Sequence, residues 1–144
     1  MLISGNCHCK NISLTLNWSP EPTEIPARAC TCSFCVKHGG VWTSCATGEL
    51  EVKINNPAQV CTYAFGTKTA TFHICAACGV VPVVTSRIDG QLYAVVSVNA
   101  LEGVPEALLK RAPVSFDDED EATRLARRKQ GWIARVRFVE GRSS

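Results

Sequence analysis

The chain has 144 residues, a mass of 15.6 kDa, nine cysteines and a formal net charge of +2. Fifteen Lys and Arg nearly balance thirteen Asp and Glu, so the charge does not favour non-specific binding to nucleic acid. The length suits one domain, and a domain of this size can bury enough surface to fold without disulfide bonds. We therefore expect a single domain over residues 1–144, with another role for the cysteines.

The sequence also indicates where the protein is located. No apolar run reaches the ~20 residues that a membrane-spanning helix needs, and residues 1–5 lack the features of a signal peptide. We expect a soluble, cytoplasmic protein with no membrane partner. Reducing conditions in the cytosol keep thiols free, so clustered cysteines there indicate metal ligands or catalytic groups rather than disulfides.

Short strands are predicted along most of the chain, because apolar and polar residues alternate over the first hundred positions. The alternation is plainest in segments 12–18 and 50–54. Further strands are expected at 41–46, 59–65, 69–74, 80–87 and 91–98. Asp89-Gly90 is typical of a tight hairpin turn. The expected fold class is therefore mainly β, with antiparallel sheets.

One short C-terminal helix is expected from about residue 117 to residue 129. Its start, 117–121, is entirely acidic and its end, 127–129, is basic, which complements the helix dipole. We interpret the acidic run as a solvated helix start rather than a metal site. After Gly131 the alternation returns over 132–138, which predicts a final strand.

Seven of the nine cysteines form three tight groups, which are Cys7-His8-Cys9, Cys30-Thr31-Cys32-Ser33-Phe34-Cys35 and Cys75-Ala76-Ala77-Cys78-Gly79. Neighbouring thiolates on a tetrahedral zinc lie about 3.7 Å apart, a separation that a Cys-x-x-Cys turn can provide. A Cys-x-Cys pair places both side chains on one side of an extended chain. Each group is therefore a partial metal site. Cys45 and Cys61 stand alone in predicted strands, where we expect them to be buried core residues.

The number of ligands that zinc needs divides the seven cysteines between two metal sites. A structural zinc has four protein ligands, whereas a catalytic zinc has three and one open position. The division is a four-thiolate site of Cys7, Cys9, Cys75 and Cys78 and a three-thiolate site of Cys30, Cys32 and Cys35. Two alternatives stay open for the second group: His38 completes it as a structural site, or its thiols bind no metal. His8 and His73 are expected to be ordinary surface or core histidines.

From Gly5 to about Leu101 the chain resembles the glutathione-dependent formaldehyde-activating enzyme and centromere protein V family. The resemblance rests on Gly5-x-Cys7-x-Cys9, Cys30-x-Cys32-Ser33-x-Cys35 followed by Gly39 or Gly40, Tyr63-x-Phe65-Gly66, and Phe72-x-x-Cys75-x-x-Cys78-Gly79. It implies a β-tent fold with a structural zinc on the outer two pairs and a second zinc, on the central three cysteines, beside a glutathione site. Lys10, Val36 and Val80 stand where the family usually has other residues.

The donor set indicates the chemistry. A zinc held by three thiolates carries a net negative charge, so it binds a thiol more readily than it ionises water. With the resemblance, this predicts a carbon-sulfur lyase, S-(hydroxymethyl)glutathione synthase-like, that joins glutathione or a similar thiol reversibly to formaldehyde. Its catalytic site would be Cys30, Cys32 and Cys35, with Lys37 and His38 nearest to orient substrate.

Two other functions stay open, and the oligomeric state is not predicted. One is a binding module in which both zinc ions only stabilise a β scaffold; its basic clusters would be 124–129 and the strand with Arg135 and Arg137. The other is a redox sensor that releases its central thiolates on oxidation.

Overall fold

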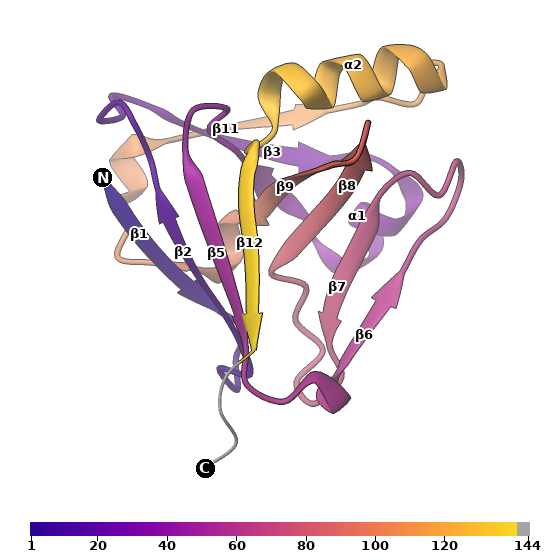
Figure 1. The fold of residues 1–144 in the computed structure, drawn as a ribbon. Coiled ribbons are helices and arrows are strands. Elements are labelled where there is room, and N and C mark those ends of the chain that lie inside the picture. Colours follow the sequence, from indigo (N-terminus) through magenta and orange to yellow (C-terminus); the bar gives the residue numbers. More distant parts are fainter. Residues whose placement is uncertain (141–144) are drawn as a thin grey trace.

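The computed structural model describes residues 1–140, which form two β-sheets and two α-helices (Figure 1). The five-stranded sheet has, in spatial order, β10 (Leu101–Glu102), β1 (Leu2–Asn6), β2 (Ile12–Asn17), β5 (Glu49–Ile54) and β12 (Arg135–Glu140). The seven-stranded sheet has β11 (Leu109–Val114), β3 (Ile25–Cys30), β4 (Val41–Thr43), β9 (Gln91–Ser97), β8 (Val83–Ile88), β7 (Thr71–Cys75) and β6 (Val60–Tyr63). Short 3-10 turns lie at Pro57–Gln59, Val98–Ala100 and Glu106–Leu108. The mainly β prediction is confirmed.

The strands follow the predicted alternation. In β2, Ile12, Leu14 and Leu16 are buried while the residues between them are not. Leu14 pairs with Val52 and Leu16 pairs with Leu50 in antiparallel register, so one face of the sheet is continuous and apolar. This face forms the larger core of the protein together with Ile25, Val83, Val96 and other buried residues of the second sheet.

Four strands were not predicted, namely β1, β3, β10 and β11, and two strand pairs differ from the antiparallel rule. β11 runs parallel to β3, and β12 runs parallel to β5. Both strands reach their partners from far along the chain, so no hairpin turn fixes their direction. The other strand pairs of residues 1–140 are antiparallel.

The predicted C-terminal helix is confirmed as α2 (Glu121–Gly131), although residues 117–120 of the acidic run precede it. The helix lies above the start of β12 at the top of Figure 1. Its cap is Asp120, whose carboxylate accepts a hydrogen bond from the Thr123 backbone at 2.7 Å. A second helix, α1 (Ser33–His38), was not predicted because its six residues are too few to show a helical period. Neither of these helices is long and apolar enough to cross a membrane, nor is any other helix of residues 1–140.

The connection between α2 and β12 is fixed to the second sheet at one fully buried residue. Ile133 forms an antiparallel bridge with Ala94 of β9, with backbone hydrogen bonds of 3.0 and 2.9 Å. Its side chain belongs to the larger core. This bridge therefore holds the end of α2 against the seven-stranded sheet.

We predict that Ile133→Ala lowers the free energy of unfolding by about 2–5 kcal/mol, because it removes buried methyl groups at a fully packed position. Denaturant unfolding followed by circular dichroism measures the loss. Leu2→Ala is the control, since Leu2 is 70% exposed and its truncation should change stability by no more than about 0.5 kcal/mol. Equal losses for the two variants would contradict this account of the core.

Candidate functional site

The first and last cysteine pairs come together as predicted. Cys7 Sγ lies 3.8 Å from Cys9 Sγ, and Cys9 Sγ lies 3.5 Å from Cys75 Sγ. With Cys78 the four sulfurs lie within 4.8 Å of one another, and Cys7 and Cys75 are fully buried. These separations are close to the ~3.7 Å of neighbouring thiolates on zinc. We call this group the thiol quartet; it could hold one zinc ion.

Two tight turns place the quartet. Cys7 and Cys9 follow β1, and Lys10 closes their turn with a φ of 67°, a left-handed conformation that favours glycine. Cys75 ends β7, and Gly79, with a φ of 83°, donates its N–H to the Cys75 carbonyl at 2.8 Å. Since β1 and β7 belong to different sheets, the quartet joins the two sheets.

The chemistry of the quartet fits a cation. Burial raises the pKa of Cys7 to about 12, so this thiol stays protonated at neutral pH unless a positive charge lies beside it. The backbone N–H of Ile12 points at the Cys7 sulfur at 3.3 Å, and that of Cys78 points at the Cys75 sulfur at 3.5 Å. Such N–H···S bonds favour thiolates over thiols, as a bound divalent metal would.

The central cysteines form a second group, the thiol trio of Cys30, Cys32 and Cys35. Cys30 ends β3, Cys32 caps α1 and Cys35 lies within α1, and their sulfurs lie within 4.8 Å of one another. The Cys32 sulfur accepts a hydrogen bond from the Cys35 backbone N–H at 3.3 Å. Helix α1, with its cysteine cap, is therefore what brings the trio together.

Hydrogen bonds also set the charges of the trio. A hydrogen bond from Cys35 lowers the pKa of Cys30 to about 6, and the same bond, with burial, raises the pKa of Cys35. Trp42 Nε1 donates to Cys35 Sγ at 3.4 Å. The trio thus favours one thiolate even before a metal ion is considered.

No fourth metal-ligating side chain of residues 1–140 joins the trio. His38 is exposed and its ring packs against Phe34 in a tilted arrangement, with ring centroids 4.4 Å apart, so the alternative in which His38 completes the site is not supported. His8 is exposed outside the quartet. His73 contacts Thr85 and Phe138 instead of a cysteine sulfur.

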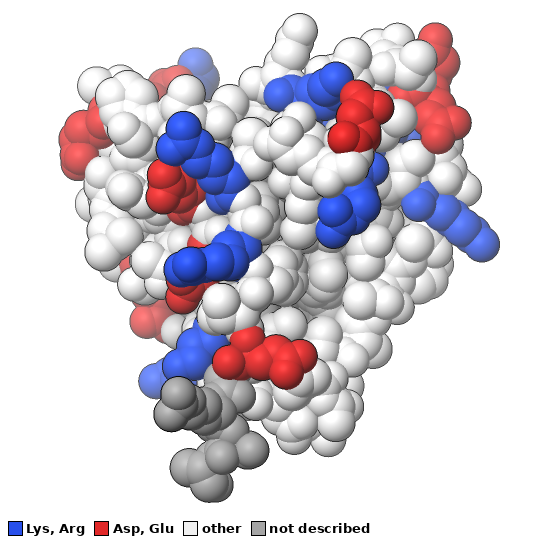
Figure 2. Space-filling view, viewed as in Figure 1, with Lys and Arg blue, Asp and Glu red and all other residues white. Residues whose placement is uncertain are grey.

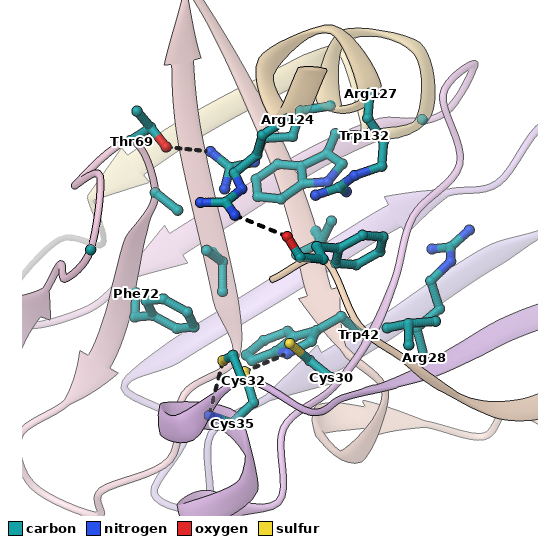
Figure 3. Close-up of a pocket in the computed structure, with 18 of the residues that line it drawn as sticks. Arg28, Cys30, Cys32, Cys35, Trp42, Thr69, Phe72, Arg124, Arg127 and Trp132 are labelled. Carbon is teal, nitrogen blue, oxygen red and sulfur yellow. Dashed lines mark hydrogen bonds between the residues drawn. The ribbon is translucent and has the colours of Figure 1, made fainter. Parts of the chain in front are cut away.

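A cavity of about 460 Å³ lies beside the trio (Figure 3). Its apolar walls include Trp42, Phe72, Val84, Val95 and Trp132. Its polar walls include four arginines, which are Arg28, Arg124, Arg127 and Arg128. In Figure 3 the cysteines lie at one end of the cavity and α2 lies at the other. The volume is in the range of pockets that enclose small molecules.

Sequence reasoning missed these arginines as site residues. Positions 124, 127 and 128 are spaced so that they share one helix face, a signal that was available but was interpreted as a basic helix end. No local pattern pointed to Arg28. Val36, in contrast, is 65% exposed and lies outside the cavity, and Val80 packs against the larger core.

The burial prediction is confirmed for one of the two isolated cysteines and wrong for the other. Cys45 is buried in the larger core, as predicted. The prediction for Cys61 was wrong, because this cysteine is exposed. It lies on β6, the edge strand of the seven-stranded sheet, where only the first residue is partly buried.

Comparison with known proteins agrees with the seven cysteines and the two-sheet fold. The sequence model of the family described as "Glutathione-dependent formaldehyde-activating enzyme" matches residues 2–113. The chain therefore belongs to the glutathione-dependent formaldehyde-activating enzyme family. The match contains both cysteine groups and ends before α2.

A solved structure supports the same fold. The chain is similar to a Rhodobacter sphaeroides protein whose crystal structure was determined by structural genomics, with 28% identity and a TM-score of 0.55. The similarity covers 72% of this chain and 91% of that one. No curated protein matches the sequence.

We predict that the zinc-loaded protein holds two zinc ions and that Cys32→Ser holds one, because the substitution removes a ligand from the trio alone. Elemental analysis of purified protein measures the content. Cys61→Ser is the matched control and should keep both ions, since Cys61 lies outside both groups. One ion in wild type and in Cys32→Ser alike would exclude a zinc on the trio.

Proposed function

We propose that the protein is a zinc-dependent carbon-sulfur lyase of the formaldehyde-activating type, which joins a thiol such as glutathione reversibly to formaldehyde. The observation that carries this proposal is the contrast between the two thiol groups. The quartet offers four ligands and needs no more, whereas the trio offers three beside a cavity. Three protein ligands and an open position are typical of catalytic zinc.

The reaction needs no oxidant or reductant. The thiol sulfur forms a bond to the carbonyl carbon, and the proton lost by the thiol ends on the former carbonyl oxygen, which gives an S-hydroxymethyl product. The reverse breaks the same carbon–sulfur bond. A zinc ion on the trio would lower the pKa of the incoming thiol and hold its sulfur in place.

The chain's own residues prepare the site for this reaction. The indole N–H of Trp42 holds the Cys35 sulfur, and helix α1 fixes Cys32 and Cys35 relative to each other. Apolar side chains, among them Phe72 and Val95, border the cavity and limit water, which strengthens electrostatic interactions inside it. A cytoplasmic setting suits a protein in which none of the nine cysteines forms a disulfide.

The binding-module alternative is less well supported, because its basic clusters are largely paired. Arg135 and Arg137 on β12 pair with Glu49 and Glu51 on β5. On α2, Arg127 pairs with Glu119 and Lys129 pairs with Asp89. Figure 2 shows basic and acidic side chains mixed over the visible face. This surface does not present the single-sign patch that a polyanion would require.

We expect glutathione to change the visible spectrum of the cobalt-substituted protein and to react with formaldehyde faster in its presence. Exchange between free thiol and product, followed by NMR above the uncatalysed background, measures the rate. Cys32→Ser should lose both responses because it disrupts the trio, and Cys61→Ser should keep both. No spectral response and no acceleration in wild type would falsify the proposal.

A further inference from the structure

One cation of the cavity wall is buried without a counter-ion. Arg128 is only 7% exposed, and its Nη1 donates to Thr69 Oγ1 at 2.9 Å and to Ser86 Oγ at 3.2 Å. Its Nε has no hydrogen-bond partner, and it forms no ion pair within residues 1–140. An unpaired buried charge is costly, so a ligand anion would gain from meeting it.

The nearby carboxylates do not neutralise the cavity. Glu119 pairs with Arg127 at 2.9 Å and with Arg124 at 3.8 Å. Asp117 lines the cavity but is exposed and accepts only from Ser115. Two guanidinium groups on the wall, those of Arg28 and Arg128, therefore have no carboxylate partner among residues 1–140.

Arg128 stays charged in its buried position. Burial lowers the pKa of Arg128 to about 10, which leaves it a cation at neutral pH. Arg28 is partly buried on β3, and its nearest hydrogen-bond partner is Ser44 Oγ at 3.5 Å. The cavity wall thus has an excess of positive charge, contributed by Arg28 and Arg128.

The remaining cavity walls are mainly apolar, so they would favour a ligand with an apolar surface. The ring of Trp132 lies 5.0 Å from the Arg128 guanidinium carbon, and Phe72 and Val84 continue the apolar wall toward the trio. Formaldehyde is far too small to fill a cavity of about 460 Å³. A ligand with several peptide groups would leave some of them without partners against such walls.

We propose that the cavity selects a carboxylic acid with an apolar body, whose carboxylate binds Arg128. Arg28 lies across the cavity from Thr69, the hydrogen-bond partner of Arg128, so it adds only a longer-range attraction (Figure 3). The apolar body lies against Phe72 and Trp132. Where the ligand is the substrate thiol, which rests on the proposed function, the substrate class is an apolar mercaptocarboxylic acid. Arg128 and Trp132 lie beyond the family-matched residues 2–113, so the residue that binds the carboxylate belongs to the C-terminal segment of this chain.

A thiol-free probe pair tests the binding site by itself. We expect 3-phenylpropionate to bind the zinc-loaded protein about tenfold or more tightly than 3-phenylpropionamide, since the amide lacks the charge. Indole N–H signals in NMR report the site, because Trp42 and Trp132 line the cavity while Trp18 lies in the larger core. Equal binding of acid and amide, or binding of neither, would overturn the proposal.

Substitutions that remove one charge test which residue binds the carboxylate of the probe. Arg128→Gln should weaken binding of the acid about tenfold and leave the amide unchanged, and Arg28→Gln should weaken it to a smaller extent. Lys129→Gln is the matched control, since it removes a charge from the same helix outside the cavity and should bind as wild type does. Arg28→Gln keeps the test decisive if Arg128→Gln does not fold. Wild-type affinity in every folded variant would refute the assignment.

The two proposals fail separately. The probe contains no thiol, so Cys32→Ser should still bind it, whatever the catalytic role of the trio. If the cobalt-substituted wild-type protein binds the probe but shows no spectral response to glutathione or to 2-mercapto-3-phenylpropionate, the lyase proposal alone is removed. The opposite outcome is a cobalt spectrum that responds to glutathione. If the protein then prefers neither the acid probe over the amide probe nor 2-mercapto-3-phenylpropionate over glutathione, the carboxylate site alone is removed.

Discussion

The quartet is the constraint on which the rest of the structure depends. Cys9 and Cys75 are 66 residues apart in sequence, and Cys9 lies in the turn after β1 while Cys75 ends β7 of the other sheet, yet their sulfurs lie 3.5 Å apart. A metal ion at this point would convert its binding energy into folding energy, because the unfolded chain has no such site. Farther along the molecule the bridge between Ala94 and Ile133 makes a second connection. With the two sheets fixed in this way, the trio and the cavity wall keep a defined relation to each other.

The two thiol groups show how the number of ligands separates structure from chemistry. The quartet contains two fully buried sulfurs and satisfies a tetrahedral ion by itself. The trio also consists of cysteine sulfurs, but it has only three of them and its fourth side faces the cavity. Trp42 provides a hydrogen bond to sulfur rather than a fourth ligand. What can approach that open side is decided by the cavity and not by the cysteines.

The sequence predicted the features that depend on local spacing of residues. It did not predict the features that depend on contacts between distant parts of the chain. The cysteine groups were found because zinc geometry dictates short intervals, and β2 and β5 were found because one face of each is buried. Helix α1 was not predicted because its six residues are too few to show a helical period and because its cap is a cysteine, which is not a typical capping residue. Cys61 was misplaced because alternation does not tell an edge strand from a central one. Arg28 enters the site only because β3 lies beside β4 in the folded sheet.

Helix α2 contributes to the wall of the cavity and not to the metal sites. The family-matched residues contain every candidate metal ligand, while α2 and the residues just before and after it supply three arginines, Phe116 and Trp132 to the cavity wall. These wall residues are not needed to bind a metal ion, so they can change without loss of the trio. Because a buried polar or charged wall rejects ligands that leave it unpaired, such changes alter which ligand is accepted. On the proposed function, the family name would describe the reactive end of the cavity, and the preferred substrate would depend on this later segment.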